Sequence, residues 1–139
     1  MEALRFVVFA FLALAAGPAL AQSLEPGQWQ FDTLMTMAGA KPQTGSVQRC
    51  VTKDEAADVE SWAGRQLAQS DCRMAMKRKS ASRASWTLEC PKSGMRGTGS
   101  AILGRGTMES EQQMSGAMNG RPFEMHVKTI GKRLGPCKS

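Results

Sequence analysis

Apolar and polar side chains alternate along most of the chain, which is the period of a strand that buries one face. One such run spans residues 29–37, where Trp29, Phe31, Met35 and Met37 alternate with mostly polar residues. Further stretches predict strands at 47–51, 72–79, 83–90, 96–103, 107–118 and 121–130. The pattern therefore predicts about seven short strands.

One segment, after the second predicted strand, has helical periodicity instead. Thr52 and Glu55 have the spacing of a capping box, in which each side chain bonds the backbone amide of the other residue. The apolar positions that follow at the spacing of one helix face are Ala56, Val59, Ala63 and Leu67. We expect one helical segment here, inserted between strands.

Turn signals fix how neighbouring strands pair. Folding residues 72–90 about Ala81 sets Met74 opposite Leu88, as an apolar cross-strand pair on one face of a hairpin. Asn119-Gly120 is the strongest hairpin signal of the chain. Successive strands joined by turns predict an all-β antiparallel meander. We expect its seven strands to curl into an open barrel or a sandwich.

The first 21 residues do not fit this β pattern. Arg5 precedes eleven consecutive apolar residues at 6–16, fewer than the ~20 that span a bilayer. The small residues Ala19 and Ala21 follow, and this combination is typical of a cleaved secretory signal. We therefore expect a signal peptide at 1–21, a single domain of 139 − 21 = 118 residues at 22–139, and a periplasmic or secreted location.

The composition narrows the classes of partner. The formal net charge is +6, and it stays +6 when the signal removes one arginine and one glutamate. A basic surface attracts phosphates and anionic lipids, although the same charge also simply keeps a surface solvated. Aromatic residues are only 6% of the chain and tyrosine is absent, which argues against base stacking and hence against nucleic acid.

Four cysteines in an exported chain predict two disulfides. No Cys-x-x-Cys occurs, which argues against a structural zinc site and against a thioredoxin-like redox role. We expect the pairs Cys50–Cys72 and Cys90–Cys137, the first of which requires the helical segment to reverse direction. The rival pairing is Cys72–Cys90, opposite each other in the predicted hairpin, with Cys50–Cys137.

Methionine is the most unusual component, with ten residues in the chain. Met35/Met37 and Met74/Met76 are Met-x-Met pairs, whose side chains share a face on a strand. Thioethers placed in this way are candidate ligands for Cu(I), which favours soft sulfur. The alternative is that these methionines fill an irregular core.

Three other features of the sequence are weaker candidates for a functional site. Lys77, Arg78, Lys79 and Arg83 form the densest basic cluster, at a hairpin tip, and are candidates to bind an anionic component of the envelope. His126 is the only histidine, and no nucleophile motif accompanies it. The Gly-x-Gly pairs at 97–99 and 104–106 are not followed by a helix pattern, so they indicate turns and sheet curvature instead of phosphate loops.

Several motifs together resemble a known family. They are Pro26-Gly27-x-Trp29, Cys50-Val51-Thr52, Cys72, Trp86-x-x-x-Cys90, Gly97-x-Gly99 and the closing segment 131–137. The chain is similar to the secreted bacterial proteins grouped as domain of unknown function 3617. The resemblance implies an exported, periplasmic-type protein of Gram-negative bacteria, and it brings no established activity and no catalytic residue.

The sequence thus predicts a function of binding and not of catalysis. We expect a non-enzymatic binding or interaction module of the cell envelope, without a cofactor, whose site lies on a sheet face or in a barrel mouth. The alternative is a periplasmic metal-binding protein that holds Cu(I) with methionine thioethers.

Overall fold

The computed structural model describes residues 24–58, 65, 67, 70–80 and 82–138. Its elements are β1 (Gly27–Met37), β2 (Gln43–Val51), α1 (Lys53–Ala57), β3 (Arg73–Lys79), β4 (Arg83–Cys90), β5 (Met95–Gly104), β6 (Thr107–Met118) and β7 (Arg121–Gly135). The predicted signal peptide lies outside the described residues. In the part of the chain that the structure describes, no helix is long and apolar enough to cross a membrane.

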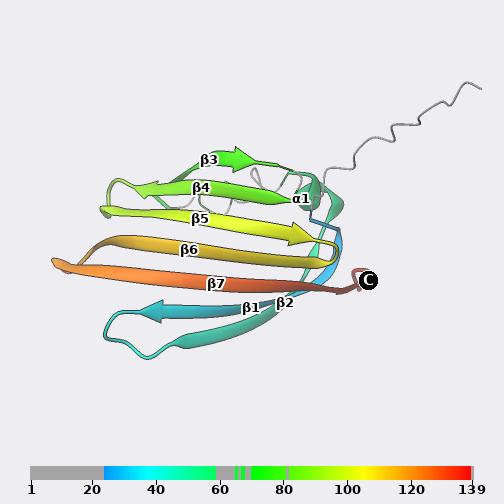
Figure 1. Cartoon of the computed structure of the whole chain (residues 1–139), viewed down its shortest axis with the longest axis horizontal. Coiled ribbons are helices and arrows are strands. Elements are labelled where there is room, and N and C mark those ends of the chain that lie inside the picture. The colour runs from blue at the N-terminus through cyan, green and yellow to red at the C-terminus, as the bar shows by residue number, and fades with distance from the viewer. Residues whose placement is uncertain (1–23, 59–64, 66, 68–69, 81, 139) are drawn as a thin grey trace, which may run out of the picture.

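The seven strands form one sheet in the order β2-β1-β7-β6-β5-β4-β3, and every neighbouring pair is antiparallel (Figure 1). The all-β class, the seven strands and the helix after the second strand are confirmed. The sheet is open, since β2 and β3 form its two edges, and the described residues form no second sheet that packs on it as in a sandwich. From β3 to β7 the strands are a simple meander, and β7 then pairs with β1.

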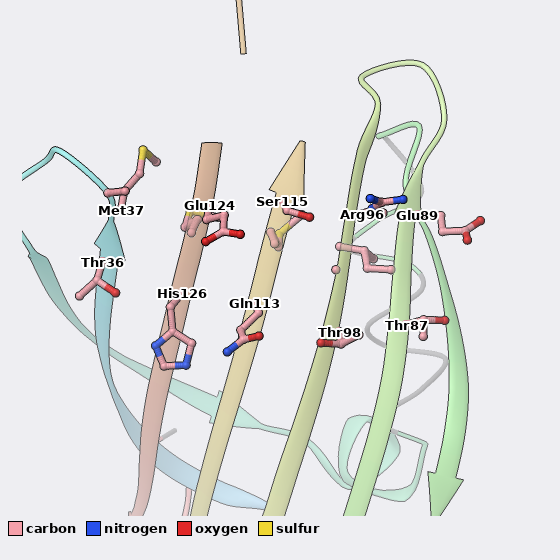
Figure 2. A pocket seen from close by; sticks show the side chains of 15 residues that line it. Thr36, Met37, Thr87, Glu89, Arg96, Thr98, Gln113, Ser115, Glu124 and His126 are labelled. Carbon is pink, nitrogen blue, oxygen red and sulfur yellow. The ribbon is translucent and has the colours of Figure 1, made fainter. Parts of the chain in front are cut away.

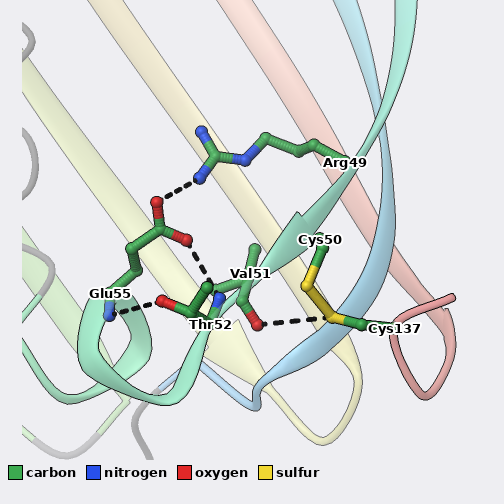
Figure 3. A network of polar contacts seen from close by, with 6 residues as sticks. All are labelled: Arg49, Cys50, Val51, Thr52, Glu55 and Cys137. Atoms are coloured by element: carbon green, nitrogen blue, oxygen red, sulfur yellow. Dashed lines mark hydrogen bonds and ion pairs between the residues drawn. A yellow bond between two sulfur atoms is a disulfide. The ribbon is translucent and has the colours of Figure 1, made fainter. Parts of the chain in front are cut away.

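The stretch between β2 and β3 joins the two opposite edges of the sheet. It begins with the predicted capping box: Thr52 Oγ1 accepts from the Glu55 amide at 3.3 Å, and the Glu55 carboxylate accepts from the Thr52 amide at 2.9 Å (Figure 3). Arg49 of β2 donates to the same carboxylate at 2.8 Å, which ties α1 to the edge strand. These hydrogen bonds stabilise the ionised carboxylate and hold the pKa of Glu55 below its ordinary value. The bond from the Thr52 amide has the larger effect on this pKa, and the bond from Arg49 has a smaller one. Val59 and Ala63 of the predicted helix face lie outside the described residues.

The core lies on the face of the sheet that α1 covers, which we call the apolar face. Trp29, Val51 and Ala56 are buried together there, and Phe31 and Met108 pack against them. The Trp29 indole donates to the carbonyl of residue 25 at 2.8 Å, so its one polar atom is satisfied. A Cβ added at Gly131 would lie 3.0 Å from Phe31 and 3.3 Å from Trp29, so these rings lie directly over the backbone of β7.

Local turn chemistry behaves as the sequence predicts. Asn119 and Gly120 both have positive φ, at 52° and 73°, which is the left-handed backbone that a two-residue hairpin turn requires. In the β3–β4 hairpin, Met74 is opposite Leu88 and Met76 is opposite Trp86, as expected. Gly97 and Gly99 lie within β5, so they are not part of a phosphate loop.

The expected disulfide pairing is wrong, and the rival pairing is present. Cys72 bonds Cys90. Cys50 bonds Cys137, as Figure 3 shows. Arg73 of β3 is paired with Glu89 of β4. Cys72 and Cys90 are the next residues along the same register, so they lie opposite each other. Cys50, on β2, meets Cys137, which lies two residues after the end of β7, because β2 and β7 lie on either side of β1. The expected Cys50–Cys72 bridge required β2 and β3 to come together, whereas they form opposite edges.

Candidate functional site

A trough of about 740 Å³ crosses the face of the sheet opposite α1, which we call the polar face (Figure 2). The side chains that line it come from β1, β7, β6, β5 and β4, which are five consecutive strands of the sheet. The polar side chains among them point away from the core because they alternate with apolar-face residues such as Met114 and Met125, which also line the trough. A second hollow continues the trough toward the hairpin tips and shares Arg96, Ser115 and Glu124 with it.

One row of the trough is fixed by strand register. Thr36 is opposite His126, His126 is opposite Gln113, Gln113 is opposite Thr98, and Thr98 is opposite Thr87. Directly opposed side chains in antiparallel strands are neighbours, with Cβ atoms ~4.5–5.5 Å apart. The row therefore presents three hydroxyls, an amide and an imidazole side by side, all able to donate and accept hydrogen bonds.

The next row of the trough carries the charges. Glu124 is opposite Ser115, Ser115 is opposite Arg96, and Arg96 is opposite Glu89. The row thus alternates in sign across the sheet, with a guanidinium between two carboxylates. Glu89, Arg96 and Glu124 are all exposed, so each charge is available to a ligand and is screened by solvent.

A third row adjoins the imidazole on the side away from the tips. Lys128 Nζ lies 2.8 Å from Glu109 Oε1 and 3.8 Å from Glu111 Oε1, and His126 Nε2 lies 3.9 Å from Glu111 Oε2. The hydrogen bond and charge of Glu109, followed by Glu111, raise the pKa of Lys128 above its ordinary value.

The polar side chains of the trough form a hydrogen-bonding surface. Nucleophilic catalysis requires a hydroxyl or thiol within hydrogen-bond reach of a base. Among the described residues, no side-chain hydrogen bond joins His126 to a serine or threonine, and no polar side chain is buried. What the trough offers is a broad set of exposed hydrogen-bonding groups on a rigid sheet.

The two predicted methionine pairs lie on the apolar face but do not come together. Met35 and Met37 are on β1 and Met74 and Met76 are on β3. Four strands lie between β1 and β3 in the sheet, so β1 and β3 are five strand spacings apart. At ~4.8 Å per spacing this is about 24 Å. The two pairs therefore do not converge on one ion.

One further cluster has the donor types of a metal site. Asp71, Cys72 and Cys90 place a ligand atom each within 4.8 Å of one another. Both sulfurs are already bonded to each other, so neither is a thiolate. The carboxylate of Asp71 accepts from the amides of Lys92, at 2.6 Å, and Ser93, at 3.0 Å. The cluster is thus a structural clamp on the β4–β5 turn.

The basic cluster lies along an edge of the sheet. Lys77, Arg78 and Lys79 end the edge strand β3, and Arg83 begins β4. The register shifts between Met76 and Arg78, which makes Lys77 the extra residue of a bulge. Lysines and bulges on edge strands discourage pairing with another chain, which is a role that Lys77 can have at this edge.

Sequence reasoning did not identify the trough. Its residues are the polar members of alternating strands, and each strand taken alone shows only that they face solvent. The rows become visible once the register across five strands is known, and register between strands far apart in sequence leaves no local signal.

Comparisons with known proteins identify a family but no activity. A family model described as "Protein of unknown function (DUF3617)" matches residues 24–137, which is nearly the whole described chain. No curated protein and no solved structure matches.

Proposed function

This chain belongs to the DUF3617 family, and we propose that it is a non-enzymatic binding module of the bacterial cell envelope. The observation that carries the proposal is the trough, in which five consecutive strands align two rows of hydrogen-bonding side chains. Sites built on strands hold their side chains in fixed relative positions, which lowers the entropy cost of binding a ligand that matches them.

Two features support an envelope location. Both disulfides close within the domain and no described cysteine is free, which is consistent with a non-cytoplasmic protein. The N-terminal residues have the pattern of a cleaved secretory signal. We accordingly propose the periplasm as the compartment in which the trough works.

The shape and chemistry of the trough suggest the class of ligand. From β1 to β4 the trough crosses four strand spacings, or about 19 Å at ~4.8 Å each. The first of its two rows is polar and largely uncharged, with Thr36, Gln113 and Thr98 among its members, and the second carries charges of alternating sign. An extended chain rich in hydroxyl and amide groups, such as a cell-wall glycan strand, fits this row better than an apolar or purely anionic ligand.

The test is NMR titration of the isotope-labelled domain with soluble cell-wall glycan fragments. We expect chemical shift changes to concentrate on the two trough rows and to be small on β2. Thr98→Lys, which puts a long charged side chain in the centre of the row, should weaken binding at least about tenfold. The matched control is Thr44→Lys, since Thr44 is also an exposed strand threonine on the polar face but lies on the edge strand β2.

Three outcomes would contradict the proposal. Shift changes confined to other surfaces would remove the trough as the site. Equal binding by the two lysine variants would show that the row containing Thr98 does not contact the ligand. A change in the mass of the fragments after incubation would show that the protein is an enzyme.

A further inference from the structure

All nine described methionines lie on the apolar face of the sheet. The strand registers place on this one face Met35, Met37, Met74, Met76, Met95, Met108, Met114, Met118 and Met125. His126, the only histidine, is on the polar face, and the described cysteines are all in disulfides. The soft ligands of the apolar face are therefore thioethers, without a thiolate or an imidazole among them.

Three of these methionines are aligned across neighbouring strands. Met37 of β1 is directly opposite Met125 of β7, and Met125 is directly opposite Met114 of β6. Opposed residues have Cβ atoms ~4.5–5.5 Å apart, so three flexible thioethers rise from one side of the sheet within reach of a common point. This row of Met37, Met125 and Met114 differs from the Met-x-Met pairs, which bring together two sulfurs of one strand.

The surroundings leave the row accessible and adaptable. All three side chains are half-buried, so solvent reaches them while the neighbouring side chains hold them in place. Gly97 lies beside Met114, and a Cβ there would be 3.0 Å from Cγ of Met114. The missing side chain gives this thioether room to move. The amide of Gln112 donates to Sδ of Met114 at 3.4 Å and occupies one lone pair of that sulfur, leaving the other for a ligand.

We propose that Met37, Met125 and Met114 form a binding site for Cu(I). Thioether sulfur is a soft, neutral ligand that suits Cu(I), whereas Zn(II) and Cu(II) favour the imidazole, thiolate and oxygen ligands that the row lacks. The thioethers of this site lie on the opposite face of the sheet from the trough's polar side chains and use none of them, although the same three residues also line the trough.

An all-thioether site has a distinctive dependence on pH. Thiolate and imidazole ligands must lose a proton before they bind a metal, so their affinity falls in acid. A thioether has no proton to lose. The affinity of the row for Cu(I) is therefore the same at mildly acidic and neutral pH.

The test is an anaerobic titration of the folded, disulfide-bonded protein with Cu(I) in competition with a chromophoric Cu(I) chelator. We expect one equivalent of Cu(I) to bind, with the same affinity in mild acid, and no displacement by Zn(II). Replacing Met37, Met125 and Met114 by leucine nearly conserves volume. Removal of a contact that only supports a metal ligand lowers the affinity for the metal by up to about 100-fold. This triple variant removes the ligands themselves, so its affinity for Cu(I) should fall by more than that.

The matched control replaces three methionines of the same face that lie outside the row, namely Met74, Met76 and Met108, by leucine. It should bind Cu(I) like the wild type. If the first triple variant does not fold, as judged by circular dichroism, Met125→Leu alone tests the centre of the row. Absence of one-equivalent binding by the wild type, equal loss in the control, or weaker binding in acid would each overturn the proposal.

Discussion

The contact between Trp86 and Gly99 gives the sharpest test of how the apolar face is packed. Gly99 of β5 is directly opposite Trp86 of β4, and it is buried. A Cβ added at Gly99 would lie 2.2–2.5 Å from three atoms of the indole ring. The ring therefore occupies the space that any other residue at this position would need, and Gly99→Ala forces the indole to move.

The magnitude follows from two opposing effects. Overpacking of this kind typically costs ~1–3 kcal/mol of the free energy of unfolding. Alanine in a strand otherwise gains ~0.5–1 kcal/mol over glycine, because glycine loses more conformational freedom on folding. Gly45 of β2 has no atom within 4 Å of an added Cβ, so Gly45→Ala shows that gain alone. Because both variants share that gain, we expect them to differ by the overpacking cost alone, about 1–3 kcal/mol, with Gly99→Ala the less stable.

Urea unfolding followed by far-ultraviolet circular dichroism measures this difference without relying on the fluorescence of Trp86. A double-mutant cycle with Trp86→Leu isolates the contact: in that background Gly99→Ala should cost clearly less, since the ring is gone. Equal stabilities of Gly99→Ala and Gly45→Ala would refute the packing of the indole over β5.

Three further predictions concern charge and covalent links. Glu55→Gln should lower the free energy of unfolding near neutral pH. The difference from the wild type should disappear as the pH falls through the lowered pKa of Glu55, because the wild-type carboxylate then becomes protonated. Urea unfolding measured from neutral to acidic pH tests this prediction. Replacing Cys72 and Cys90 together by serine should cost roughly 2–5 kcal/mol, measured by denaturation, and an unchanged midpoint would contradict a stabilising bridge. Lys77→Glu with Lys79→Glu should weaken co-sedimentation with anionic vesicles at low salt, and negligible wild-type binding to anionic and neutral vesicles alike would end that idea.

Local features of the fold were predictable from sequence, and long-range ones were not. The capping box at Thr52 and the Asn119-Gly120 turn depend on residues a few positions apart, so their chemistry is visible in the chain. The pairing of β1 with β7 joins Trp29 to Arg133, and no local pattern encodes it. The wrong disulfide assignment has the same origin, because choosing between the pairings requires knowing that β2 and β3 are opposite edges.

The same distinction between local and long-range features applies to the candidate sites. The sequence identified methionine as a candidate ligand and predicted that Met35 and Met37 share a face, which follows from strand periodicity alone. It could not show that Met37 is opposite Met125, because that depends on the β1–β7 register. The trough depends on this register together with the registers of three hairpins, so it was out of reach of any single-strand pattern.

The pairing of the first strand with the last also sets the order in which this sheet can be completed. A chain that emerges from its N-terminus presents the β1–β2 hairpin early, but the inner edge of β1 has no partner until β7 has emerged. The meander from β3 to β7 is assembled from sequential hairpins, whereas joining it to β1 closes a loop of about a hundred residues and bears the corresponding loss of chain entropy. Cys137 comes after β7, so its bond to Cys50 becomes possible only when almost the entire chain is present. Trp29 and Phe31, the centre of the core, therefore remain without their β7 neighbour throughout emergence, and the domain acquires its core at the end of that process and not during it.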